Sequence, residues 1–119
     1  MSTENIIVDK SKSFAIRCVY LYKYLNEEKH EYVMSKQILK SGTSIGANIK
    51  EALRGQTRPD FGSKMNIALK EASETEYWIE LLRDTGYIER KQAESILTDC
   101  VELLRLLTSI VKSTFQNRV

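Results

Sequence analysis

The residues best suited to bind a ligand are basic side chains that follow one line of a predicted helix. At about 100° per residue, steps of three and four keep positions within about 40° of one line. Five cations meet this spacing, provided that the helix or its exit reaches the last of them: Lys36, Lys40, Lys50, Arg54 and Arg58. Thr43 and Ala47 lie on the same line and are small enough for phosphates to approach, although Glu51 nearby weakens the patch. The alternative is that these cations form only the solvent-facing side of an amphipathic helix. A symmetric assembly would repeat the line in every subunit and would favour phosphate binding.

Metal-dependent and nucleophilic chemistry have weak support in the sequence. His30 is the only histidine, and with Glu27 it forms a Glu-x-x-His spacing that di-iron bundles use twice on inward-facing helices. The single copy lies in the polar run NEEKHE, which favours a surface capping histidine over a metal ligand. No serine or cysteine has a plausible His and Asp pair for nucleophilic catalysis. We therefore expect a protein that is not an enzyme and that holds no metal or other cofactor.

One acid has an unusual predicted environment. On a helical wheel Glu76 falls among apolar residues of the same predicted helix, such as Met65 and Ile79, so we expect it to face the core. A buried carboxylate needs a hydrogen-bond or charge partner, or else it takes up a proton. Ser41 or Asn48 could supply that partner, and a structural polar contact is favoured over an acid–base catalyst.

Four amphipathic segments position these side chains. Apolar residues recur at steps of three and four, no useful stretch alternates with period two, and Gly or Pro residues mark the second and third connections. The predicted helices run over about 9–29, 35–55, 59–86 and from 89 onward, with Ser35 as the N-cap of the second. The sequence therefore predicts an all-α, antiparallel up-down four-helix bundle over residues 9–119, preceded by a flexible lead-in at 1–8. Gly42 and Gly46, one turn apart on the apolar side of the second helix, predict close helix–helix approach.

Composition limits the remaining classes. The chain has 119 residues, 42% of them hydrophobic and 29% charged, with a formal charge of only +2, so affinity for polyanions must come from local arrangement. Cys18 and Cys100 have no metal-type spacing and are expected to be small buried hydrophobes. The N-terminus has no continuous apolar segment of a secretion signal, and no stretch approaches the roughly 18 apolar residues of a membrane span. We expect a cytoplasmic protein.

Surplus apolar side chains indicate a second contact surface. Ile16 and Tyr20 fall far from the apolar stripe of the first helix, and three residues broaden the stripe of the fourth: Val101, Leu106 and Ile110. Scattered exposed apolar residues are common, which is the simpler interpretation. Self-association that covers these side chains with another copy is favoured.

Two segments resemble a known family. SKQILKSGTSIGANIKEA and DFGSKMNIALKEASETEYWIELLRDTGYI are similar to small four-helix-bundle proteins encoded within intervening sequences of large-subunit ribosomal RNA genes. The accessory proteins of diversity-generating retroelements look like relatives. The resemblance covers about residues 7–107, and its most specific runs are SGTSIGAN and EYWIELL. The matching positions are Lys40, Ser41, Gly42, Ser44, Gly46, Asn48 and Ile49, followed by Glu71, Glu76, Tyr77 and Trp78.

The resemblance implies a bundle that assembles into a barrel-like homopentamer and binds RNA or DNA. In the retroelement branch it also implies a reverse transcriptase partner, and it brings no catalytic residues. The first hypothesis is therefore a cytoplasmic homo-oligomer that binds nucleic acid through the basic residues of the second helix, without marked sequence specificity. The alternative is a protein-binding scaffold that recruits a partner such as a reverse transcriptase.

Overall fold

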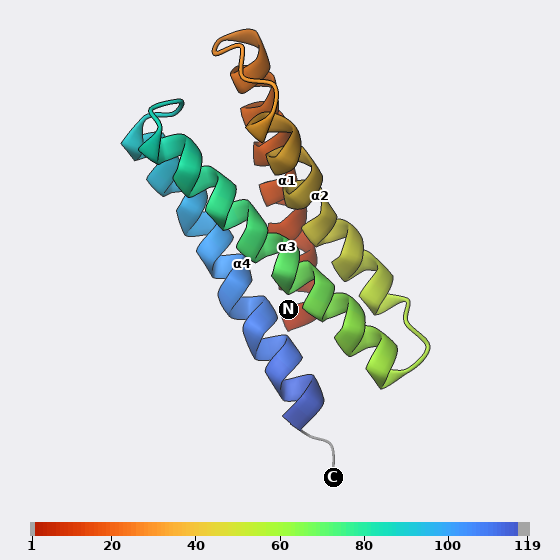
Figure 1. Cartoon of the computed structure of the whole chain (residues 1–119). Coiled ribbons are helices and arrows are strands. Elements are labelled where there is room, and N and C mark those ends of the chain that lie inside the picture. Colours follow the sequence, from red (N-terminus) through yellow and green to blue (C-terminus); the bar gives the residue numbers. More distant parts are fainter. Residues whose placement is uncertain (1, 117–119) are drawn as a thin grey trace.

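Four helices make up the computed structural model, which describes residues 2–116 and contains no strand within that range (Figure 1). The helices are α1 (Thr3–Glu27), α2 (Met34–Leu53), α3 (Arg58–Asp84) and α4 (Arg90–Gln116). Successive helices run in opposite directions, so the α1–α2 and α3–α4 connections lie at one end of the molecule and the α2–α3 connection at the other (Figure 1). The predicted all-α, antiparallel up-down four-helix bundle is confirmed.

The four helices do not pack equally. Each is adjacent to its sequence neighbours, with extensive packing of α1 on α2, α2 on α3 and α3 on α4. The contact that closes the bundle, between α1 and α4, is much the smallest, and the two hairpins diverge toward the end that holds their connections (Figure 1). The molecule is elongated, with extents of 51 × 24 × 21 Å. The α1–α4 side is therefore the open side of the bundle.

The N-terminal segment is helical from its third residue. Ser2 is the N-cap of α1, and its hydroxyl oxygen accepts a hydrogen bond from the backbone N–H of Asn5 at 3.2 Å. Ile7 is fully buried, one turn before the buried Ser11. The prediction of a flexible lead-in at 1–8 is therefore wrong for residues 3–8, because burial of Ile7 extends the apolar face of α1 by another turn. Residues 1 and 117–119 of the predicted segments lie outside the described range.

The start of α2 is organised by an acid that precedes the helix. The carboxylate of Glu31 accepts hydrogen bonds from the backbone N–H groups of Val33 (3.1 Å), Met34 (3.0 Å) and Ser35 (2.8 Å). The Ser35 hydroxyl donates to the Glu31 carbonyl oxygen at 2.9 Å. Ser35 therefore lies inside α2, and its prediction as the N-cap is wrong. The helix begins one residue earlier because Glu31 satisfies N–H groups that have no partner within the helix.

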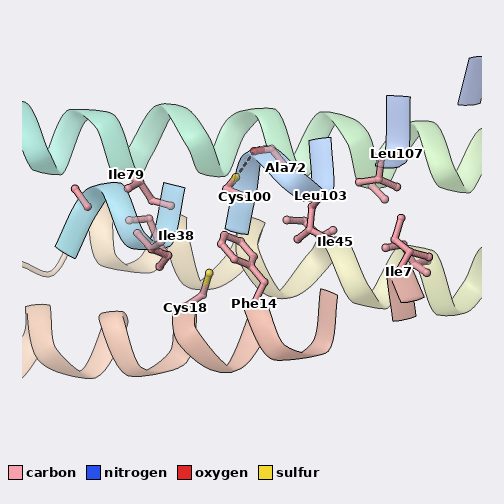
Figure 2. Packing of buried hydrophobic residues seen from close by; sticks show 14 of the residues in the cluster. Ile7, Phe14, Cys18, Ile38, Ile45, Ala72, Ile79, Cys100, Leu103 and Leu107 are labelled. Carbon is pink, nitrogen blue, oxygen red and sulfur yellow. Dashed lines mark hydrogen bonds between the residues drawn. The ribbon is translucent and has the colours of Figure 1, made fainter. Parts of the chain in front are cut away.

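The core is built from all four helices (Figure 2). Aliphatic side chains dominate it, with Phe14 at its centre and both cysteines buried within it: Ile7, Phe14, Cys18, Ile38, Ile45, Ala72, Ile79, Cys100, Leu103 and Leu107 are labelled in the view. A Cβ atom at Gly42 would overlap Cys18 Sγ, and one at Gly46 would lie 3.3 Å from Ser11 Oγ. The predicted close approach of α2 to another helix is confirmed, and the partner is α1.

The polar contact inside the core is not the predicted one. Glu76 is only half-buried, whereas its neighbour Thr75 is fully buried. The Thr75 hydroxyl lies in hydrogen-bond distance of Ser41 Oγ (2.8 Å) and of the Glu71 carbonyl oxygen (2.7 Å). The prediction that Glu76 faces the core is therefore wrong by one residue along α3. Ser41 is a buried hydrogen-bond partner, as predicted, but its partner is the Thr75 hydroxyl and not a carboxylate.

Candidate nucleic-acid interface

The basic line of α2 lies on the exposed side of the helix. Lys36, Lys40 and Lys50 are exposed, as is Arg54, the residue that directly follows the helix. The opposite side of α2 is buried through Ile38, Ile45 and Ile49. Thr43 is half-buried and Ala47 is exposed, so no large side chain separates the cations along the line. The structure therefore brings four of the five predicted residues to one accessible face.

Arg58 does not extend this line. α2 ends at Leu53, and Arg58 is already the first residue of α3. Its guanidinium Nε donates a hydrogen bond to the carbonyl oxygen of Thr114 near the end of α4, at 3.2 Å. The prediction of Arg58 as a fifth member of the line is wrong, because the chain turns between the two helices. Its hydrogen bond instead links the start of α3 to the end of α4.

Two nearby acids, Glu71 of α3 and Glu51 of α2, could offset the charge of the four remaining cations. Lys40 lies close enough to Glu71 to lower the pKa of that carboxyl, although burial and the neighbouring Glu74 outweigh it and the pKa of Glu71 is raised. Glu51 forms a salt bridge with Lys64 at 3.3 Å. The acid expected to weaken the patch is therefore directed toward α3. Within residues 2–116, none of the four cations of the line forms a salt bridge.

The helix dipole of α2 favours one cation of the basic line and disfavours another. Lys50 lies in the last turn, where the helix dipole favours a cation, so helix stability alone gives a reason for it. Lys36 lies in the first turn, where the same dipole disfavours a cation. Helix stability therefore does not explain the basic line as a whole.

The surplus apolar residues differ in exposure. Ile16 and Tyr20 on α1 are 48% and 67% exposed. Val101, Leu106 and Ile110 on α4 are only half-buried, and the last two also pack against the core. The second surface expected from the sequence is therefore clearest on α1. Val19, which is 38% exposed, belongs to the same region and was missed because it adjoins Cys18 of the core stripe.

A shallow groove of about 320 Å³ follows the open side of the bundle. Its lining comes from α1, from the α3–α4 connection and from α4: Arg17, Tyr20, Leu21, Tyr24, Ile88, Gln92 and Ile96. Arg17 bridges the two helices beside it, since Nη1 lies 2.7 Å from a carboxylate oxygen of Asp99 and Nη2 donates to Ser95 Oγ at 3.0 Å. Tyr24 and Gln92 were not predicted here, because a groove between helices is not visible on the wheel of either helix.

The residues considered for chemistry lie apart from these surfaces. His30 is exposed in the α1–α2 connection, at a backbone φ of 52°, and its Nδ1 lies 3.2 Å from the Tyr32 hydroxyl. Cys18 and Cys100 are buried free thiols, and burial raises the pKa of each to about 12. In the described part of the chain no three His, Cys, Asp or Glu residues gather as a metal site would require. Over the same residues no helix is long and apolar enough to span a membrane.

The fold is a small all-α bundle with an exposed basic line on α2. The chain belongs to the 23S rRNA-intervening sequence protein family, which matches residues 3–109. It is similar to a crystal structure of a protein of unknown function from the S23 ribosomal protein family of Bacteroides thetaiotaomicron. The two are 60% identical, with a TM-score of 0.92 over 93% of this chain and 99% of the other. No curated protein matches the chain. The family resemblance drawn from the sequence is confirmed.

Proposed function

We propose that this chain is a non-enzymatic, cytoplasmic homo-oligomer that binds RNA or DNA through the basic side chains of α2. The observation that carries the proposal is the exposed line of Lys36, Lys40, Lys50 and Arg54, none of which has a salt-bridge partner among the described residues. Cations that are not neutralised by neighbours can replace the counterions of a phosphate backbone, and their release drives binding. Small side chains between the cations let that backbone approach.

The assembly is the second part of the proposal. Exposed Ile16 and Tyr20 on α1 provide apolar surface that another copy would cover, and the family resemblance implies five subunits. Symmetry then repeats the basic line around the assembly, so that each subunit contributes the same contacts to one long ligand. This supports useful affinity for nucleic acid despite a formal charge of only +2 per chain. Contacts to phosphates imply little sequence preference.

The test is a charge reversal at the C-terminal end of the line, where Lys50 and Arg54 lie. Changing Lys50 and Arg54 together to glutamate should leave the fold intact, because both side chains are exposed. Affinity for RNA or DNA of mixed sequence, measured by fluorescence anisotropy, should fall about tenfold or more at low salt. The slope of log affinity against log salt should flatten by about 0.7 on single strands for each phosphate that is no longer neutralised.

A matched control separates local contacts from net charge. Changing Lys91 and Arg105 of α4 together to glutamate alters the formal charge by the same amount and also affects two exposed positions. It should leave most of the affinity and the salt slope in place. Equal losses in the two variants, or no loss in the Lys50/Arg54 variant, would show that the α2 line is only a solvated face.

The groove between α1 and α4 favours a second candidate function, that of a protein-binding scaffold. Tyr20 and Tyr24 line it, and tyrosine is among the side chains that dominate protein interfaces. A partner such as a reverse transcriptase would then dock on the open side of the bundle. Tyr24 lines the groove but is not among the residues assigned to self-association. Substituting Tyr24 with alanine should weaken binding of a purified reverse transcriptase partner while leaving nucleic-acid affinity unchanged. The opposite pattern would remove the scaffold candidate.

A further inference from the structure

A cleft of about 620 Å³ separates the exposed ridges of α1 and α2, beside the basic line. The buried Ser11 and Gly46 lie at its base, where the two helices approach closely: a Cβ at Gly46 would lie 3.3 Å from Ser11 Oγ. Ala15, Thr43 and Ala47 continue the lining with small side chains. The cleft is therefore open to a narrow chain without any rearrangement of large residues.

The charges around this cleft are unbalanced. Lys12 from α1 lines it together with Lys50 and Arg54, and Asp9 is the one acid among its lining residues. None of the three cations forms a salt bridge within residues 2–116. Two other cations on α1 are paired with acids of α4, since Lys10 lies 3.0 Å from Glu102 and Arg17 lies 2.7 Å from Asp99. A net positive cluster from two helices therefore lies at one accessible place.

We propose that the sugar–phosphate backbone of a nucleic acid lies in this cleft, with Lys12 as a third phosphate contact beside Lys50 and Arg54. The proposal rests on the proposed function and adds a residue from a second helix to it. The lining favours this occupant over a protein helix, because it has three cations against one acid and contains no aromatic side chain. Without aromatic platforms for bases, recognition depends on phosphate charge and is independent of sequence.

The first test reverses one charge on α1. Lys12→Glu in the full-length chain should lower affinity for a single-stranded RNA of mixed sequence about tenfold, and the salt slope should flatten by about 0.7 for each phosphate that Lys12 no longer neutralises. Lys23→Glu is the matched control, since Lys23 is also exposed on α1 but does not line the cleft. It should change affinity by less than about threefold. Equal losses in the two variants would overturn the assignment of Lys12.

The second test fills the cleft without changing charge. Ala47→Leu keeps a good helix former at an exposed position, so the bundle should fold, as circular dichroism would verify. Affinity for the same RNA should fall several-fold while the mass of the assembly stays constant. Unchanged affinity would overturn the cleft as the path of the backbone. Dissociation of the assembly would overturn it too, because the cleft would then be a contact between subunits.

The results also separate this inference from the proposed function. If Lys12→Glu and Ala47→Leu bind normally while the Lys50/Arg54 variant has lost affinity, the α2 line binds phosphate and the cleft does not. If the Lys50/Arg54 variant binds normally, both proposals fail.

Discussion

At the residue scale, one carboxylate organises the entry into α2. Glu31 precedes the helix by three residues and is almost fully buried, yet it accepts hydrogen bonds from three backbone N–H groups. The first N–H groups of a helix have no acceptor within it, and their positive partial charge attracts an anion. Glu31 therefore both satisfies donors and matches the helix dipole.

Removing this carboxylate should destabilise the bundle measurably. Glu31→Ala leaves three N–H groups without their acceptor, and the loss of a helix cap costs about 0.5–2 kcal/mol. We expect a decrease of about 1–2 kcal/mol in the free energy of unfolding, measured by urea denaturation, and a smaller decrease for Glu31→Gln. Equal stability of Glu31→Ala and the unchanged protein would show that water replaces the carboxylate without cost.

The two thiols give a prediction with a defined pH dependence. Burial raises the pKa of Cys18 and Cys100 to about 12, from an ordinary value of 9.0. The folded state then holds these protons more tightly than the unfolded chain, so the thiols contribute stability below pH 9 that is lost as pH rises toward 12. At a pH of about 8.5, near the ordinary thiol pKa, both thiols should resist a small alkylating reagent in the native protein and react readily in denaturant. Rapid native alkylation of either thiol would contradict its burial.

At the element scale, the distance between α1 and α2 depends on a glycine facing a cysteine. Alanine is a better helix former than glycine by about 1 kcal/mol, but a Cβ at Gly42 would overlap Cys18 Sγ. Overpacking of this kind costs about 1–3 kcal/mol. We expect Gly42→Ala to destabilise the protein in urea denaturation, whereas Gly46→Ala, which meets Ser11 Oγ at 3.3 Å, should have a smaller effect.

A double substitution tests the cause of that effect. Cys18→Ala removes the sulfur that the new methyl group would meet. The combined Gly42→Ala/Cys18→Ala variant should therefore be more stable than the sum of the two single changes predicts, since neighbouring sites that share a steric conflict are not additive. Strict additivity would mean that the cost at Gly42 arises elsewhere.

The helices were predictable as elements, but their ends and pairings were only partly so. Steps of three and four in apolar positions identify four helices, and the short connections between them predict that successive helices alternate in direction. The start of α1 was missed because the polar but buried Ser11 lies between Ile7 and Phe14 and interrupts the apolar series. The cap of α2 was missed because Glu31 acts from a connection, which periodicity does not describe. Arg58 was misplaced because the line of α2 was extended through the turn at Gly55.

In the candidate site, too, features of a single helix were predictable and contacts between helices were not. The exposed basic side of α2 was visible in the spacing of Lys36, Lys40, Lys50 and Arg54. Lys12 could not be predicted as part of the site. Its position near Lys50 depends on how α1 packs on α2, and a helical wheel of one helix does not describe that packing. Glu51 was placed near the patch, but its salt bridge with Lys64 of α3 is a tertiary contact as well.

At the scale of the whole molecule, assembly is the first prediction. The chain has a mass of 13.7 kDa, and light scattering after size exclusion should give several times that value at micromolar concentration. Ile16→Glu should weaken assembly and leave helicity intact, because the side chain is 48% exposed in the single chain. A monomeric mass for the unchanged protein would contradict the assembly. If the Ile16→Glu variant lost both the oligomeric mass and its helicity, Ile16 would belong to the core. Leu106 is a poorer probe, since it packs against the core.

The central claim is that phosphate contacts, repeated by assembly, hold a nucleic acid on this protein. The most direct measurement is the affinity of the unchanged protein for single-stranded RNA of mixed sequence as a function of salt. With two or three cations from each subunit and about 0.7 counterions released per phosphate bound, log affinity should fall linearly with log salt, with a slope steeper than about −3. RNAs of unrelated sequence should give the same line. An affinity that does not change with salt, or no binding at low ionic strength, would contradict the account.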